Sequence, residues 1–185
     1  MNEEVDFVKR MAVVTKLATD NPGIGRTALM KCMYLLQTVK GVPLGYRFQL
    51  YAYGPYDSTV LDDLGMAEVW NTVEERVEQY SRGYKYAIFP GTKYGEFLES
   101  TAIFLEKHAE AIKWVIDNFK EYTAAGFELL GTMVWADREA QRSQEKWSKD
   151  ELIRLVLEIK PRFSKDQADQ IFEKLKRLGV FVAIA

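Results

Sequence analysis

NPGIGRTALMKCMYLLQTVKGVPLGYRFQLYAYGPYD, residues 21–57, is the stretch that decides the fold. Its opening Asn-Pro-Gly stops a preceding helix. Apolar residues then recur every three or four positions, which predicts a helix over residues 26–39 that ends at Gly41 as a C-cap. Residues 46–53 alternate between two faces, as the residues of a half-buried strand do. The stretch therefore predicts a helix followed by an aromatic strand, which Gly54-Pro55 ends.

The residues on either side of this stretch predict more helices and one hairpin. Residues 3–19 have helical periodicity. A helix over residues 60–69, with Asp57 or Ser58 as its cap, precedes two β-like runs at 72–80 and 84–89, joined by a turn at 81–83. The resulting order of helix, helix, strand, helix and hairpin has the content of a winged helix-turn-helix with some rearrangement.

The second half of the chain is expected to be helical. Apolar stripes cover residues 104–119 and 127–134. Capping-box patterns begin two further helices at Ser148 and Ser164, and a short strand is expected over residues 180–184.

The predicted fold class is mainly α with a small β-sheet, an α+β protein. At 185 residues the chain is long enough for one well-buried domain, 1–185. We expect this domain to consist of a winged-helix-like lobe, 1–90, and a helical lobe, 91–185.

Charge is unevenly distributed around the opening stretch. From Asn21 to Tyr56 the chain has no aspartate or glutamate, although its formal net charge is -2. The cations in this window are Arg26, Lys31, Lys40 and Arg47. The acids that follow, Asp57, Asp62, Asp63, Glu68, Glu74, Glu75 and Glu78, face only Arg76 in the sequence. Such segregation indicates a surface that meets a partner.

The candidate binding residues come from both sides of this charge boundary. They are Arg26, Lys31, Arg47, Tyr51, Tyr53, Tyr56, Asp57, Asp62, Asp63 and Arg82. The helical pattern predicts that Arg26 and Lys31 are exposed; alternatively, acids from elsewhere in the fold neutralise these cations. The tyrosines either anchor a partner or stack bases, or they pack the strand against the preceding helix. Both interpretations stay open because alternate residues of a strand face opposite ways.

The sequence contains little that suggests catalysis. One histidine and one cysteine cannot form a closed zinc site. His108 lies on an apolar stripe and is interpreted as a satisfied core histidine, and Cys32 as a small core residue. No nucleophile elbow, P-loop or acid/base pair of carboxylates stands out. We therefore expect a protein that is not an enzyme and has no metal or cofactor.

Cysteine content and hydropathy bear on the compartment. A single cysteine excludes an intrachain disulfide, which favours the cytoplasm. The first residues are acidic rather than basic, unlike a signal peptide. No apolar run approaches the roughly 20 residues that span a bilayer, so no membrane partner is expected.

Five motifs resemble the YwgA-like family of small bacterial and archaeal proteins. They are Gly25-Arg26-Thr27-Ala28-Leu29-Met30-Lys31, Tyr34-Leu35-Leu36-Gln37, Tyr46-x-Phe48-x-Leu50-Tyr51-x-Tyr53-Gly54-Pro55-Tyr56, Phe127-Glu128-Leu129-Leu130-Gly131-Thr132 and Lys160-Pro161-Arg162-Phe163-Ser164. This resemblance spans most of the chain and implies a winged-helix-like fold without a known catalytic residue. More distantly, the lysine-containing helix, the aromatic strand and the Tyr-Gly-Pro-Tyr turn are similar to Panacea (SocA-like) antitoxin domains and to the toxin-binding C-terminal domain of DarG-type antitoxins. Those relatives imply a protein that holds another protein in check.

Two functions remain as hypotheses. A winged-helix DNA-binding transcriptional regulator would insert the helix before the hairpin into the major groove, with Arg82 and Lys85 at the wing tip. That helix carries Asp62, Asp63 and Glu68 and no cation, so DNA phosphates would repel it. We therefore favour a non-enzymatic protein-interaction or regulatory module, antitoxin-like, that binds a protein partner or itself; nucleic acid is the less favoured partner. This hypothesis predicts that Asp62→Lys with Asp63→Lys weakens partner capture and leaves the fold intact.

Overall fold

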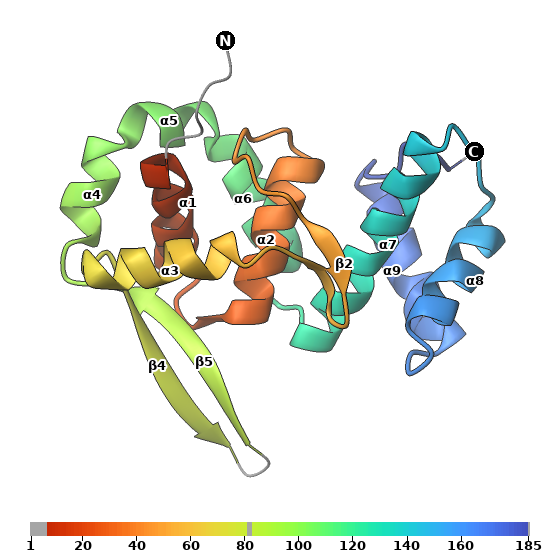
Figure 1. Cartoon of the computed structure of the whole chain (residues 1–185), viewed down its shortest axis with the longest axis horizontal. Coiled ribbons are helices and arrows are strands. Elements are labelled where there is room, and N and C mark those ends of the chain that lie inside the picture. Colours follow the sequence, from red (N-terminus) through yellow and green to blue (C-terminus); the bar gives the residue numbers. More distant parts are fainter. Residues whose placement is uncertain (1–6, 81–82, 185) are drawn as a thin grey trace. The chain divides into compact units, whose positions relative to one another are not determined.

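The structure is a computed structural model that describes residues 7–80 and 83–184. It is mainly helical, with a three-stranded and a two-stranded antiparallel sheet (Figure 1). The predicted fold class, mainly α with a small β content, is therefore confirmed. The chain forms two compact units: Met1–Phe48 with Asp57–Tyr122, and Gln49–Tyr56 with Thr123–Ala185. The division thus falls at Tyr122 rather than after residue 90, and the aromatic hairpin belongs with the C-terminal helices.

The first unit contains three helices, three strands and then a run of short helices. Its elements are α1 (Phe7–Asp20), β1 (Ile24–Gly25), α2 (Arg26–Thr38), α3 (Thr59–Val69), β4 (Val73–Tyr80), β5 (Gly83–Pro90), α4 (Tyr94–Ser100), α5 (Ala102–Lys107) and α6 (Ala109–Phe119). The sheet order is β1-β5-β4, with Ile24 opposite Ile88 and Val77 opposite Tyr86.

The core of this unit forms around α1 and α2. Met11 and Leu17 on α1 and Leu29 and Leu36 on α2 are completely buried. Helices α3, α4, α5 and α6 all contact α1 (Figure 1). The expected continuous helix over residues 104–119 is therefore broken at His108, because the chain must turn to keep its short helices against α1.

The second unit is a short hairpin with three helices. Its elements are β2 (Gln49–Tyr51), β3 (Gly54–Tyr56), α7 (Ala124–Arg142), α8 (Lys149–Ile159) and α9 (Lys165–Arg177). β3 packs against α7, and α7 packs against α8 and α9. Both predicted capping boxes are present, at Ser148 with Glu151 and at Ser164 with Gln167.

Two strand predictions need correction. The strand expected over residues 46–53 is confined to Gln49–Tyr51, because the backbone of Tyr46 pairs with the side-chain amide of Gln37 instead of a neighbouring strand. Pro55 does not end the sheet; it pairs with Leu50 at a position where its missing N–H is not needed.

The strand expected over residues 180–184 is also absent from the part of the chain that the structure describes. Only a single bridge joins Trp147 and Ile184. The side chain of Asp137 accepts hydrogen bonds from the backbone N–H groups of Val182 and Ala183, and so takes the donors that a strand would use.

Candidate functional site

The two adjacent aspartates of α3 have opposite environments. Asp62 is exposed, whereas Asp63 is 3% exposed and accepts hydrogen bonds from Arg10 Nε at 2.7 Å and from Tyr46 Oη at 2.7 Å. Asp63 shares its helix face with Val60 and Ala67, which are fully buried. The prediction that Asp63 binds a partner is therefore wrong: its carboxylate holds the unit together.

The prediction that Lys31 is an exposed binding residue is also wrong, because this side chain is only 2% exposed. The run from Leu29 to Leu36 is buried throughout, so α2 is covered on all sides. An amphipathic pattern assigns one exposed face to such a helix, and this assumption fails where neighbouring elements surround it.

Arg26 is already paired within the first unit. Its guanidinium forms a bidentate ion pair with Glu75 on β4 and lies 3.8 Å from the centre of the Tyr86 ring. The hydrogen bond to Glu75 raises the pKa of Arg26. The alternative in which acids from elsewhere in the fold neutralise the cations therefore describes Arg26 correctly. Lys40 also has a neighbour, since its ammonium lies 4.7 Å from the Trp114 ring centre.

Asp57 joins the loop before the hairpin to the start of α3. Its carboxylate accepts the backbone N–H of Arg47 and, at 2.9 Å, that of Thr59. Burial by itself raises the pKa of Asp57, but these donors outweigh burial, so the pKa is lowered overall. Asp57 thus caps α3, while the side chain of Arg47 is exposed.

The aromatic hairpin β2–β3 presents two of the three predicted tyrosines. Tyr51 is 56% exposed and Tyr53 is 67% exposed. Tyr56 is half-buried, and its ring meets that of Tyr51 edge to face at 5.4 Å. The hairpin therefore offers an aromatic surface in the second unit. Arg82, the remaining candidate, lies outside the described residues.

A buried polar network supports this hairpin, and sequence reasoning missed its role. Lys160 Nζ donates to the carbonyl oxygens of Ala52 and Tyr51 and lies 3.3 Å from Glu128 Oε1. Arg162 pairs with the other oxygen of Glu128. Glu128 is 2% exposed and Lys160 5%. The available signal was a lone glutamate inside the apolar run of residues 127–134, since a charge in such a run needs a partner.

A groove lies beside the C-terminal end of α3. It has a volume of about 450 Å³ and is lined by Val69, Trp70, Asn71, Thr72, Lys93, Glu96 and Phe97. Val69 is 70% exposed and Trp70 39%. Sequence reasoning assigned Val69 to the helix and did not predict an exposed apolar surface there.

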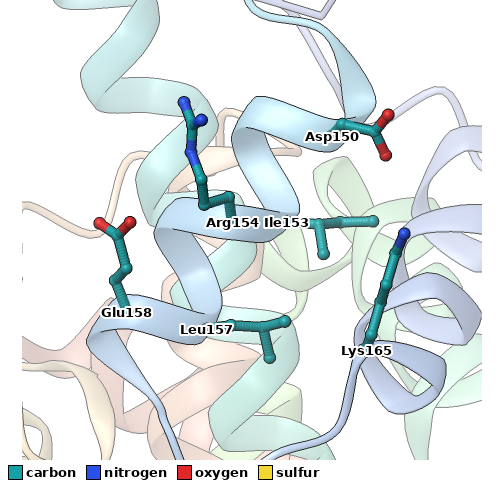
Figure 2. A pocket seen from close by; sticks show the side chains of 6 residues that line it. All are labelled: Asp150, Ile153, Arg154, Leu157, Glu158 and Lys165. Atoms are coloured by element: carbon teal, nitrogen blue, oxygen red, sulfur yellow. The ribbon is translucent and has the colours of Figure 1, made fainter.

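A second groove, of about 440 Å³, lies along α8 in the second unit. Figure 2 shows Ile153 and Leu157 on the side of Lys165, and Arg154 and Glu158 on the opposite side. Asp150 completes the lining. Two acids thus stand with two cations around a small apolar floor, and this mixture selects no ligand chemistry.

The two side chains most often used in catalysis, the Cys32 thiol and the His108 imidazole, are poorly placed for reaction. Burial raises the pKa of the Cys32 thiol to about 12, so it stays protonated. His108 is half-buried against Phe104, with ring centres 4.7 Å apart, and burial lowers its pKa. Its Nε2 has no hydrogen-bond partner among the described residues, so the prediction of a satisfied core histidine is wrong. Across residues 7–80 and 83–184 no cluster of three His, Cys, Asp or Glu could hold a metal ion.

Comparisons with known proteins identify no family. No family model matches the chain, and no curated protein matches it. The resemblance to the YwgA-like family therefore stays a prediction. Within the described residues, every helix is too short or too polar to cross a membrane.

Proposed function

We propose that this chain is a non-enzymatic protein-interaction or regulatory module with a winged-helix-like first unit. The connectivity supports the scaffold: α1, β1, α2 and α3 precede the β4–β5 hairpin, and β1 pairs with β5. In such a scaffold α3 is the helix that meets the partner and the hairpin is the wing.

The observation that carries the proposal is the outer face of α3. Asp62, Met66 and Val69 follow one another along this face, and all three are exposed. No lysine or arginine occurs in α3. A DNA-reading helix gains its affinity from cations against phosphates, and Asp62 opposes that attraction. Exposed apolar side chains beside a carboxylate suit a protein surface instead.

The aromatic hairpin supports the same function in the second unit. Tyr51 and Tyr53 are rigid, amphipathic side chains of the kind that anchor protein interfaces. We infer that they form a second contact surface. The resemblance to antitoxin domains supports a regulatory role in which the partner is a protein held inactive.

The test uses the full chain and Asp62→Lys with Met66→Lys. The earlier Asp63→Lys change is unsuitable because it would break a buried ion pair. We expect the double variant to retain less of the protein partner in affinity purification from host lysate, while the wild type shows no binding to generic duplex DNA at about 150 mM salt. Glu106→Lys, at an exposed site on α5, is the matched control and should change nothing.

Fluorescence anisotropy with the duplex separates this function from the DNA-binding regulator. Two features of the first unit are also compatible with a DNA-binding regulator, namely its connectivity and Lys85 on the β4–β5 hairpin. Salt-dependent duplex binding by the unmodified protein, with no protein retained in the purification, would overturn the proposal.

A further inference from the structure

We propose that the outer edge of β4 pairs in antiparallel orientation with the same edge of a second copy of this chain. Val77 lies at the centre of this two-fold symmetric contact, opposite its own equivalent. The two β4–β5 hairpins then form one continuous antiparallel sheet. The inference goes beyond the proposed function and does not depend on it, because the contact uses the backbone of β4 rather than the outer face of α3.

Strand β4 lies at the edge of its sheet. In the order β1-β5-β4, β5 runs along one side of β4, and among the described residues no strand runs along the other. The β4–β5 hairpin projects away from the helices of the first unit (Figure 1). A strand edge of this kind presents N–H and C=O groups on which a further strand can form.

One hydrogen bond shows which backbone groups of β4 face outward. The N–H of Glu75 donates to Oε1 of Glu68 on α3 at 3.1 Å, so it points away from β5. Alternate residues of an antiparallel strand direct their N–H and C=O groups to the same side. The backbone groups of Val77 and Gln79 therefore also point outward. Glu68 covers the edge at Glu75, and the edge beyond it is available for pairing.

One face of the hairpin exposes apolar side chains to water. Val77 is 62% exposed and lies opposite Tyr86 on β5. Tyr84 is 67% exposed, and its ring meets that of Tyr86 edge to face at 5.9 Å. Pairing of two β4 strands would align Tyr86, Val77 and their equivalents in one row across the sheet. Each Val77 would then be covered by its own copy, which removes apolar surface from water.

The charges on the other face match those of a second copy. This face of β4 carries Glu74, Arg76 and Glu78. With Val77 opposite itself, Arg76 lies opposite Glu78 of the second copy, and two-fold symmetry repeats this complementary pair. Within one chain Arg76 pairs with Glu74 and Glu78 with Lys85, but these side chains are exposed and such pairs contribute little. They are therefore free to rearrange in a dimer.

Neighbouring registers lack this match. A register centred on Arg76 would place Arg76 opposite itself and Glu74 opposite Glu78, and a register centred on Glu78 would place Glu78 opposite itself. Like charges directly opposite each other are destabilising. A register centred between two residues would set outward-facing groups of one strand against inward-facing groups of the other. A strand of unrelated sequence has no such match built in, so the second copy is the occupant that β4 fits.

The pairing also leaves the contact between Glu68 and Glu75 intact. Val77 would exchange its N–H and C=O bonds with its own equivalent, and the N–H of Gln79 would donate to the carbonyl of Glu75 in the second copy. The N–H of Glu75 keeps Glu68 as its acceptor. A single short ladder buries less than the roughly 1,200 Å² of a stable interface, so the dimer should be weak and reversible.

Sedimentation equilibrium of the full chain, from about 10 μM to about 1 mM at about 150 mM salt, tests the association. We expect a dimer that forms as concentration rises, with slower hydrogen exchange at the amides of Val77 and Gln79. Val77→Lys should raise the dimer dissociation constant about tenfold or more, because it removes the apolar contact and sets like charges at the two-fold axis. Ile103→Lys is the matched control, since Ile103 is 88% exposed on α5, away from β4.

A charge exchange tests the register. Arg76→Glu and Glu78→Arg should each weaken the dimer about tenfold, because each variant alone sets like charges opposite each other at both symmetric positions. A mixture of the two variants restores opposite charges at both positions and should associate as the wild type does. Recovery in the mixture also shows that each variant is folded.

Several outcomes would overturn the inference. A chain that stays monomeric at about 1 mM is one, and a dimer that Val77→Lys leaves unchanged is another. A mixture of the charge variants that associates no better than either alone would refute the register. Loss of the dimer in Asp62→Lys with Met66→Lys would move the interface to α3. If that α3 variant changes neither the dimer nor the retention of a protein partner, the proposed function fails and this inference stands.

Discussion

Each unit of this protein contains a buried glutamate or aspartate that pairs with cations, and the two networks serve different ends. In the first unit, Asp63 joins α3 to Arg10 on α1 and to the hydroxyl of Tyr46. In the second unit, Glu128 on α7 pairs with Lys160, which also donates to the carbonyls of the β2–β3 hairpin. The first network closes a core. The second fixes the backbone of a hairpin whose tyrosines face solvent.

The contrast shows how a binding surface is supported in each unit. On α3, the exposed Asp62 directly precedes the structural Asp63, so the outer face is presented by a helix tied down from within. In the hairpin, Lys160 reaches the backbone beneath the exposed side chains. Replacing Asp63 should therefore destabilise the whole first unit, whereas replacing Lys160 should only loosen the hairpin of the second.

The largest effect is expected for Asp63→Ala. Arg10 and Tyr46 would lose their acceptor in the core, which should lower the free energy of unfolding of the first unit by about 3–5 kcal/mol. Urea denaturation followed by circular dichroism measures this loss. The matched control is Asp62→Ala, which should stay within about 0.5 kcal/mol of wild type. Equal losses for the two variants would contradict the assignment of Asp63 to the core.

An intermediate effect is expected for Lys160→Met. The carbonyls of Tyr51 and Ala52 would lose their donor, but Glu128 would keep Arg162, so the expected loss is about 1–3 kcal/mol. Hydrogen exchange should accelerate at the amides of residues 49–56 and not in α3. Arg162→Met is the control, because the Arg162 side chain is 55% exposed and its ion pair is screened. Unchanged exchange in the hairpin would refute the comparison between the two networks.

The smallest effect is expected at Asp57, which is only partly buried. Its lowered pKa means that the folded state favours the carboxylate, so its contribution is present above the ordinary value of 3.8 and is lost as pH falls through the folded-state pKa. Asp57→Ala should cost about 1 kcal/mol at pH 7, as loss of a helix cap does. Thermal unfolding across acidic pH should show the difference between wild type and variant shrinking. A difference that does not depend on pH would exclude this carboxylate as the cause.

Local patterns predicted much of the secondary structure correctly. The α2 helix, the β4–β5 hairpin and both capping boxes follow from periodicity, turn residues and side chains that bond their own backbone. The aromatic strand was overextended because Gln37, distant from it in sequence, binds the backbone of Tyr46.

The candidate site was predicted less well, for a physical reason. Exposure of Tyr51 agrees with the alternation of the strand, whereas Tyr53 is exposed because it lies in the turn after Gln49–Tyr51. Lys31 was assigned to a surface by the helical pattern and Asp63 by the acidic charge of its helix, yet both are buried. The groove at Trp70 could not be found from the sequence, since it forms where the backbone at Gly91, before α4, packs against Asn71, after α3.

By itself the sequence determined the helical composition, the helix caps and the uneven distribution of acids and cations, because each depends on residues within a few positions of one another. Only the tertiary structure decided which charges are free. Arg26 meets Glu75 and Arg10 meets Asp63 across about 50 residues of chain. Whether a charge is satisfied or available depends on such distant partners, and therefore on how the helices pack.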